Sequence, residues 1–174
     1  SVMQRELAIG QEDRVGNPKI LLVQLEFGTW AQAKAWSYLG NFAVEDGLRA
    51  NGCDCVTLPA LSGVTDSSPL SWLHHAKQLL AGQRFDQVWV WLVHNRFSDA
   101  FLEWGAELAP VRVGLIMESL KYSEEDCRRW PHLRERAGFV ERQVRHMTHV
   151  LAADEHDAEA LNRSGLVQAV FWPS

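Results

Sequence analysis

The sequence has few cysteines and no long apolar run, and both shortages narrow what the protein can be. Three cysteines among 174 residues do not make a complete disulfide framework. Cys53 and Cys55 lie two residues apart in an apolar run, so the alternation of a strand places both on one face as reduced core residues. No segment approaches the roughly 18 apolar residues of a membrane span, and the N-terminus lacks the order of a signal peptide. We therefore expect a cytoplasmic protein.

Basic charge and glycine-rich motifs are also scarce. The formal net charge is −5, which does not fit the basic surface that binding to a phosphate backbone usually needs. The motifs G-x-G-x-x-G, G-x-x-x-x-G-K-[ST] and G-x-S-x-G do not occur, which argues against dinucleotide-binding, P-loop and hydrolase sites. The histidine pairs 74/75 and 146/149 lack the spacing of a zinc motif. We expect no nucleic-acid partner, no metal and no cofactor.

The sequence does contain an alternation of apolar, strand-length segments with amphipathic helical ones. Lys19–Glu26 is a nearly continuous apolar run, which is typical of a central parallel strand. Five more strands are predicted at residues 53–59, 85–93, 111–117, 149–154 and 167–173. Helices are predicted at residues 33–50, 69–81, 98–108, 124–147 and 154–162.

This order of elements predicts the fold class. It favours a three-layer, Rossmann-like α/β fold: an open parallel sheet of about six strands with helices on both faces. The domain covers residues 18–174, after a polar, flexible lead-in at residues 1–17. Pro131 is expected to kink or restart the helical region 124–147, which begins with a capping-box pattern at Ser123. The six arginines of that region, mixed with five acids, are typical of a solvated helix face.

The first candidate binding residues follow the first strand. In an open parallel sheet, ligands bind at the carboxyl ends of the strands, near the switch in strand order. The segment "EFGTWAQAK" provides Gly28, Thr29 and Trp30 at such an end. The ring of Trp30 is suited to stacking on a sugar.

A second group follows the third strand. The segment "HNRFSD" brings together His94, Asn95 and Arg96 where the most hydrophobic strand leaves the core. A neutral imidazole there would accept a proton from a sugar hydroxyl or form a hydrogen bond with it, and Arg96 would hold an anion. The competing interpretation is a histidine that caps the next helix or binds a backbone carbonyl.

A third group follows the fourth strand, in "ESLKYSEED". Glu118 stands at the strand end, and Ser119, Lys121 and Tyr122 come just after it. A carboxylate beside a histidine at the mouth of a crevice is a pair whose surroundings can separate an acid from a base. The alternative is that Glu118 pairs with Lys121 or Arg112, or caps the adjacent turn.

The end of the chain, "HVLAADEHDAEALNRSGLVQAVFWPS", resembles the end of the N-terminal domain of GT-B fold glycosyltransferases. In that family a strand, a short helix that ends at a glycine and a last strand lead into an interdomain linker. The segment "VGLIMES" and the arginine-bearing helix also look like this family, especially its bacterial family-4-like or spore-coat-type members. The resemblance covers about residues 19–174 in order and length.

The resemblance implies transfer of a sugar from an activated nucleotide sugar to an acceptor that this half binds. Most donor contacts would come from a C-terminal domain or subunit, so the chain is expected to continue past Ser174 or to meet a partner, and to be inactive alone. By position, His94 matches the strand-end histidine that faces the reacting sugar, and Glu118 matches the polar residue that ends the next strand. The glycine-rich loop of many members is reduced here to Gly28.

Two other interpretations stay open. One is a non-catalytic, flavodoxin-like binding or regulatory module, which would keep the fold without the chemistry. The other is a small enzyme in its own right, for which the sequence offers no complete set of catalytic residues.

Overall fold

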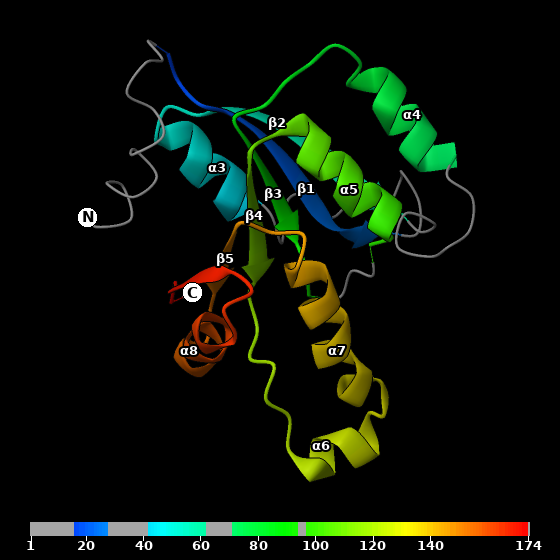
Figure 1. The fold of residues 1–174 in the computed structure, drawn as a ribbon, viewed down its shortest axis with the longest axis vertical. Coiled ribbons are helices and arrows are strands. Elements are labelled where there is room, and N and C mark those ends of the chain that lie inside the picture. The colour runs from blue at the N-terminus through cyan, green and yellow to red at the C-terminus, as the bar shows by residue number, and fades with distance from the viewer. Residues whose placement is uncertain (1–15, 28–41, 62–70, 94–96, 174) are drawn as a thin grey trace.

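A computed structural model shows the predicted parallel sheet and describes residues 16–27, 42–61, 71–93 and 97–173 (Figure 1). All neighbouring strands run parallel, in the order β2-β1-β3-β4-β5-β6. The strands are β1 (Lys19–Phe27), β2 (Asp54–Leu61), β3 (Gln87–Trp91), β4 (Val111–Ile116), β5 (His149–Ala152) and β6 (Gln168–Phe171). The predicted α/β fold class is therefore confirmed, with strand boundaries that differ from the predicted ones by a few residues.

The strand order contains one switch point. After β2 the chain crosses β1 and forms β3 on the other side, so the order reverses between β1 and β3. The first five strands have the flavodoxin-like order, and β6 is added at the far edge. The segments that follow β1 and β3 therefore leave the sheet at the place where ligands bind in folds of this kind.

Helices cover both faces of the sheet, as predicted. Val44 and Leu48 of α3 (Phe42–Ala50) pack on one face, in a cluster with Leu22 and Leu115. The opposite face is packed by four helices, and residues of all four belong to a second buried cluster. These helices are α4 (Ser71–Leu79), α5 (Asp99–Leu108), α7 (His132–Val144) and α8 (Glu155–Ser164).

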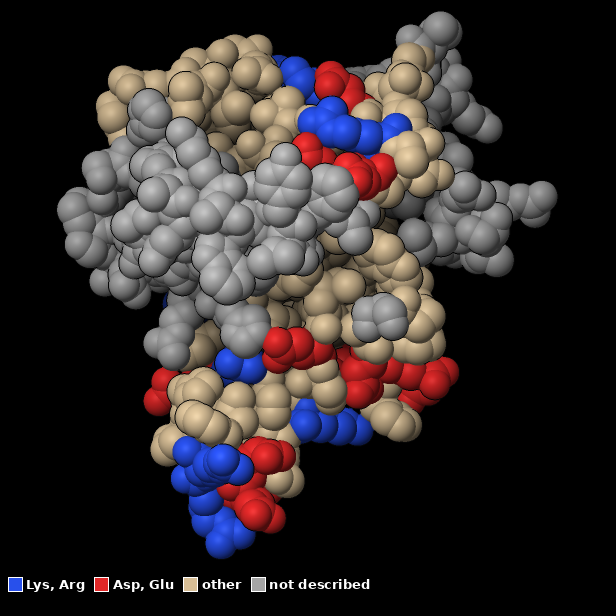
Figure 2. Space-filling view, turned by 180° about the vertical axis from the view of Figure 1, so that it is seen from behind, with Lys and Arg blue, Asp and Glu red and all other residues tan. Residues whose placement is uncertain are grey.

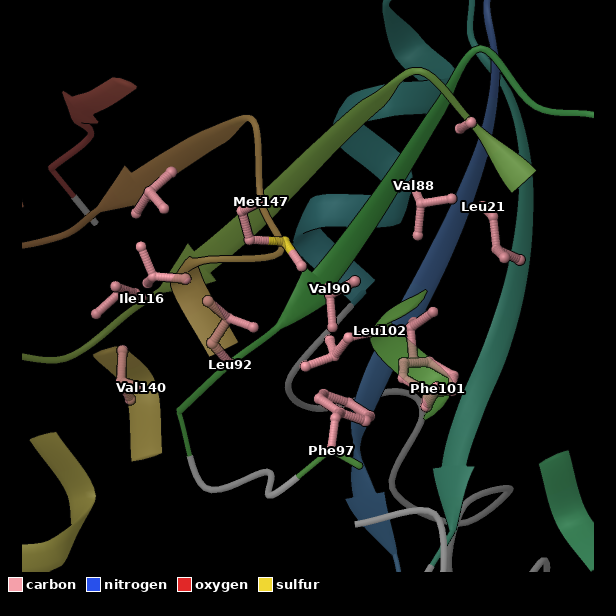
Figure 3. Close-up of a cluster of buried hydrophobic side chains, with 14 of the residues drawn as sticks. Leu21, Val88, Val90, Leu92, Phe97, Phe101, Leu102, Ile116, Val140 and Met147 are labelled. Carbon is pink, nitrogen blue, oxygen red and sulfur yellow. The ribbon is translucent and has the colours of Figure 1, made fainter. Parts of the chain in front are cut away.

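Alternation along β3 divides its side chains between the two clusters. Val88 and Val90, with Leu92 just beyond the strand, point into the larger cluster (Figure 3), whereas Trp89 belongs to the smaller one. Next to them, Gly114 of β4 has no room for a side chain, because a Cβ there would lie 2.6 Å from Leu92 Cδ1. A glycine in a strand interior is here required by close packing.

Helix caps explain several element boundaries. The Ser98 side chain accepts a hydrogen bond from Phe101 N at the start of α5, and the Asp154 side chain accepts from two backbone amides at the start of α8. Gly52 and Gly165 follow α3 and α8 with φ of +84° and +70°, the left-handed conformation that ends many helices. Cys55 is buried and Cys53 packs on the same cluster, which confirms the predicted shared face.

The expected break at Pro131 is confirmed. The helix α6 (Glu124–Arg129) ends before it, and α7 begins just after it. Figure 1 shows α6 and the first turns of α7 extending beyond the carboxyl ends of the strands; we call residues 123–136 the arm. Arginine and acidic side chains are mixed on it (Figure 2, bottom), as predicted for a solvated face. Within the described ranges, we find no helix with the length and apolar character needed to cross a membrane.

Candidate functional site

The candidate site lies at the carboxyl edge of the sheet, where β1, β3 and β4 end. Four of the predicted site residues, Glu118, Ser119, Lys121 and Tyr122, lie in the segment that follows β4. The other six lie outside the described residues: Gly28, Thr29, Trp30, His94, Asn95 and Arg96. Of the predicted sugar-binding crevice, only the third group belongs to the described residues.

Glu118 is held from α7. The Nη1 atom of Arg136 lies 3.2 Å from the Glu118 carboxylate and also donates to the Tyr122 hydroxyl at 3.2 Å. The guanidinium carbon lies 5.7 Å from the centre of the Tyr122 ring, within the range of a cation–π contact. Only 15% of the Arg136 side chain is exposed, against 43% for Glu118. A fixed cation thus orients a carboxylate that solvent can still reach.

This arrangement corrects two expectations. The alternative interpretation of Glu118 was an ion pair with Lys121 or Arg112, and the ion pair in the structure is with Arg136. Arg112 lies near the amino end of β4, where its Nε donates to the carbonyl of His146 at 2.8 Å. Arg136 was assigned to a solvated helix face, but the restart of the helix after Pro131 turns α7 back toward the end of β4.

The other flank of the same segment is held by acids of α8. The backbone N–H of Leu120 donates to Asp157 Oδ2 at 2.8 Å. Asp157 is only 6% exposed, and this burial raises the pKa of its carboxyl because it disfavours the charged form. The pKa of Asp154 is lowered, chiefly by a hydrogen bond from the Ser119 hydroxyl. Hydrogen bonds from backbone amides at the start of α8 lower it by smaller amounts. Ser119 thus contributes to holding the segment that carries Glu118.

Lys121 completes the described part of the site. Lys121 is exposed, and its backbone N–H donates to the Ser119 hydroxyl at 3.2 Å. The four described residues therefore lie together, and Glu118, Tyr122 and Lys121 carry polar side-chain groups at this edge. Their chemistry suits hydrogen bonding to hydroxyl groups.

Sequence reasoning missed three residues of this region. Arg136, Gln143 and Asp157 contact the segments that follow β3 and β4, yet each lies in a helix far from them along the chain. Asp157 had a partial signal, because it stands in the first turn of a predicted helix. No signal in one sequence indicates the side-chain contacts of Arg136 or Gln143.

A separate cavity of about 340 Å³ lies away from the carboxyl edge, between the ends of α4 and α5. Lys77, Arg84 and Glu107 line it, and buried Trp104 contributes to its floor. Both helices end there before the next strand begins, which places this cavity near the amino ends of the strands. Its lining mixes charges of both signs and carries no set of groups directed at one ligand.

The thiols and acids of the described ranges do not assemble a metal centre. No group of three or more His, Cys, Asp or Glu residues is placed to hold a metal ion in that part of the chain. Cys53, Cys55 and Cys127 are free thiols, and for Cys53 and Cys55 this agrees with the expected reduced core residues. Burial raises the pKa of the Cys53 and Cys55 thiols, which favours their protonated form.

Comparison with known proteins adds no family to this description. No protein-family model matches the sequence, and a search of curated proteins finds no match.

Proposed function

We propose that the chain is the acceptor-binding half of a glycosyltransferase, with the acceptor sugar at the carboxyl edge of the sheet. The observation that carries the proposal is the Glu118 carboxylate, which is fixed by Arg136 and still 43% exposed where β4 ends. An oriented carboxylate is a strong acceptor for the hydroxyl hydrogen bonds of a sugar. The Tyr122 hydroxyl, held by the same guanidinium, adds a second polar contact.

The strand order supports the same location. The switch lies between β1 and β3, so the residues predicted to stack on the sugar and to take its proton, Trp30 and His94, follow the two strands that flank it. In the proposed reaction an acceptor hydroxyl oxygen bonds to the anomeric carbon of the donor while the bond to the nucleotide phosphate breaks. The hydroxyl proton passes to the His94 imidazole. Most donor contacts would come from a partner domain, so this chain alone would be inactive.

The second candidate is a non-catalytic, flavodoxin-like binding or regulatory module. Two observations favour it: the flavodoxin-like order of the first five strands, and the pairing of Glu118 with a cation that already satisfies part of its charge. Such a module would bind a polar molecule at the same edge without transferring a group.

Titration of the ¹⁵N-labelled chain with glucose, mannose and N-acetylglucosamine tests the first proposal. We expect amide shifts at residues 117–122 and 97–99, and none with the nucleotide sugar UDP-glucose. Glu118→Gln should weaken sugar binding about tenfold or more, because a charged acceptor is replaced by a neutral one. Glu124→Gln is the matched control: Glu124 also pairs with an arginine, Arg134 at 2.7 Å, but on the exposed arm.

Three outcomes would each contradict part of the first proposal. Sugar shifts confined to residues 77–84 and 104–108 would place binding in the amino-end cavity and contradict the proposed site. Equal effects of the two glutamine variants would remove Glu118 from sugar binding. Tight binding of UDP-glucose would show that the donor site has been assigned to the wrong half.

A further inference from the structure

In the part of the chain that the structure describes, β6 has no strand beside its outer edge. It pairs with β5 on one side and stands at the end of the strand order (Figure 1, red). Trp172 N, just after the strand, donates toward β5, to Ala152 O at 2.8 Å. Successive residues of a parallel strand direct their backbone groups to opposite sides, so Ala169 and Phe171 direct theirs outward. Unpaired N–H and C=O groups at such an edge are a template for another strand.

A side-chain amide from α8 occupies part of this edge. Asn162, in the last turn of α8, donates from Nδ2 to the carbonyl of Ala169 at 2.8 Å. Its Oδ1 accepts a hydrogen bond from Ala169 N, also at 2.8 Å. A carboxamide carries a donor and an acceptor, as the backbone of a neighbouring strand does. Asn162 therefore satisfies both outward groups of Ala169 in the place of a strand.

The opposite edge of the sheet has a similar contact. Asp54 N of β2 donates to Pro18 O at 2.9 Å, so the next residue, Cys55, faces outward. The Cys55 carbonyl accepts a hydrogen bond from Arg49 Nη2 of α3 at 2.6 Å. Pro59 in the same strand has no N–H to offer, and proline within a sheet is typical of edge strands. At both edges, a side chain of the preceding helix thus bonds to an outward backbone group.

Apolar side chains flank the part of the β6 edge that Asn162 leaves open. Phe171 is 43% exposed, and Leu166, just before the strand, is 41% exposed. Exposed apolar side chains beside unpaired backbone groups favour pairing with another strand. A second copy of this chain presents the same edge. Two such edges related by a twofold axis are self-complementary, because the donors of each then face the acceptors of the other.

From this geometry we infer that the outer edge of β6 is a surface for pairing with a second copy of this chain, and that Asn162 keeps it closed. The amide occupies the outward groups of Ala169, which leaves those of Phe171 as the open pair within the strand. One residue offers too few hydrogen bonds to hold a partner strand, since each adds little net free energy. The inference goes beyond the proposed function and does not depend on it.

The test replaces Asn162 by alanine in the 174-residue chain and follows association by sedimentation equilibrium. Since β6 has only four residues, pairing would be weak, and concentrations up to about 1 mM are needed. The mass of Asn162→Ala should rise with concentration by up to about twofold, as for a dimer, while the unmodified chain stays monomeric. The matched control is Ser164→Ala. Ser164 also contacts the backbone at the end of α8, where it accepts from Leu166 N at 3.2 Å, but it does not bond to β6.

A second variant and a second measurement locate the contact. Adding Phe171→Lys to Asn162→Ala places a charge on the edge and should return the mass to that of a monomer. At low concentration, the Ala169 N–H of Asn162→Ala should exchange at least about tenfold faster than in the unmodified chain, because it has lost its acceptor. Its exchange should slow again as the concentration rises. If Asn162→Ala does not fold, Asn162→Ser, whose shorter side chain cannot make both contacts, takes its place.

Each outcome decides the inference. A mass for Asn162→Ala that rises with concentration, falls with Phe171→Lys and is accompanied by renewed protection of the Ala169 amide supports it. The inference is overturned if Asn162→Ala stays monomeric, or if Ser164→Ala or the unmodified chain associates as strongly. Association that leaves the Ala169 amide unprotected, or that persists with Phe171→Lys, would place the contact on another surface and also overturn it.

Discussion

The chain leaves β3 and β4 at neighbouring points of the carboxyl edge, and different chemistry holds the two exits. The exit of β3 is held by the neutral, fully buried amide of Gln143. The exit of β4 is held by charged groups, Asp157 on one flank and Arg136 on the other. Neutral buried hydrogen bonds depend little on pH or salt, whereas charged contacts depend on both. Adjacent parts of one edge should therefore respond differently to the same change of solution.

The largest effect is expected from removing the neutral contact. Gln143→Leu leaves two buried backbone groups without this partner, which should lower the free energy of unfolding by about 2–4 kcal/mol. Urea denaturation at low and high salt measures it, and the loss should be the same in both. A loss that shrinks as salt is added would mean that charge, not the amide, holds this exit.

A smaller effect is expected at the buried acid. Asp157→Ala removes the acceptor of Leu120 N–H and should cost about 1–3 kcal/mol. Asp157→Asn keeps an acceptor and removes the buried charge. Because burial raises the pKa of Asp157 above its unfolded value, the folded state binds the proton more tightly. The contribution of this carboxyl to stability is therefore full below the ordinary aspartate pKa and falls as pH rises through the interval up to the raised value.

The pH dependence of the Asp157 contribution can be measured by comparing the unmodified chain with Asp157→Asn. The asparagine variant should gain stability relative to the unmodified chain as pH rises through that interval. Unfolding curves across the acidic range provide the comparison, with Gln143→Leu as the control that should show no such trend. If the free energy of unfolding of the unmodified chain rose relative to that of the asparagine variant as pH increased, the assigned direction of the Asp157 pKa shift would be wrong.

The smallest effect is expected at the ion pair. A double-mutant cycle of Glu118→Gln and Arg136→Met should give a coupling energy of about 0.2–1 kcal/mol, since Glu118 is 43% exposed and solvent screens the pair. The coupling should decrease with added salt. The same cycle on Glu124 and Arg134, whose side chains are 78% and 55% exposed, should give less. A larger coupling for the arm pair would show that partial burial does not strengthen the contact at Glu118.

The fold was predictable from the sequence because its signals are local. Apolar runs such as Lys19–Glu26 and glycines such as Gly52 and Gly165 mark strands and helix ends within a few residues of where they occur. Pro131 likewise broke the long helix where expected. The strand boundaries were less accurate: β3 begins after and ends before the predicted bounds, although Leu92 and Val93 stay buried just beyond the strand.

The candidate site was only partly predictable, for a physical reason. The segment after β4 follows from the end of an apolar run, so Glu118 and Tyr122 were found. Their shared partner Arg136 depends on the angle between α6 and α7, which no local pattern encodes. The contacts of Gln143 join residues 46 and 51 positions apart, so they too depend on tertiary packing. The site predictions after β1 and β3 lie outside the described residues and stay predictions.

The crowding at Gly114 has a consequence for genetics. A methyl group there would press on Leu92, whose carbonyl is one of the two anchor points of Gln143. Alanine is the smallest change available at this position, yet its methyl group would force the buried side chain of Leu92 to move without altering any polar group. Because a chain of marginal stability loses its folded population steeply on heating, position 114 is a suitable place to seek temperature-sensitive alleles.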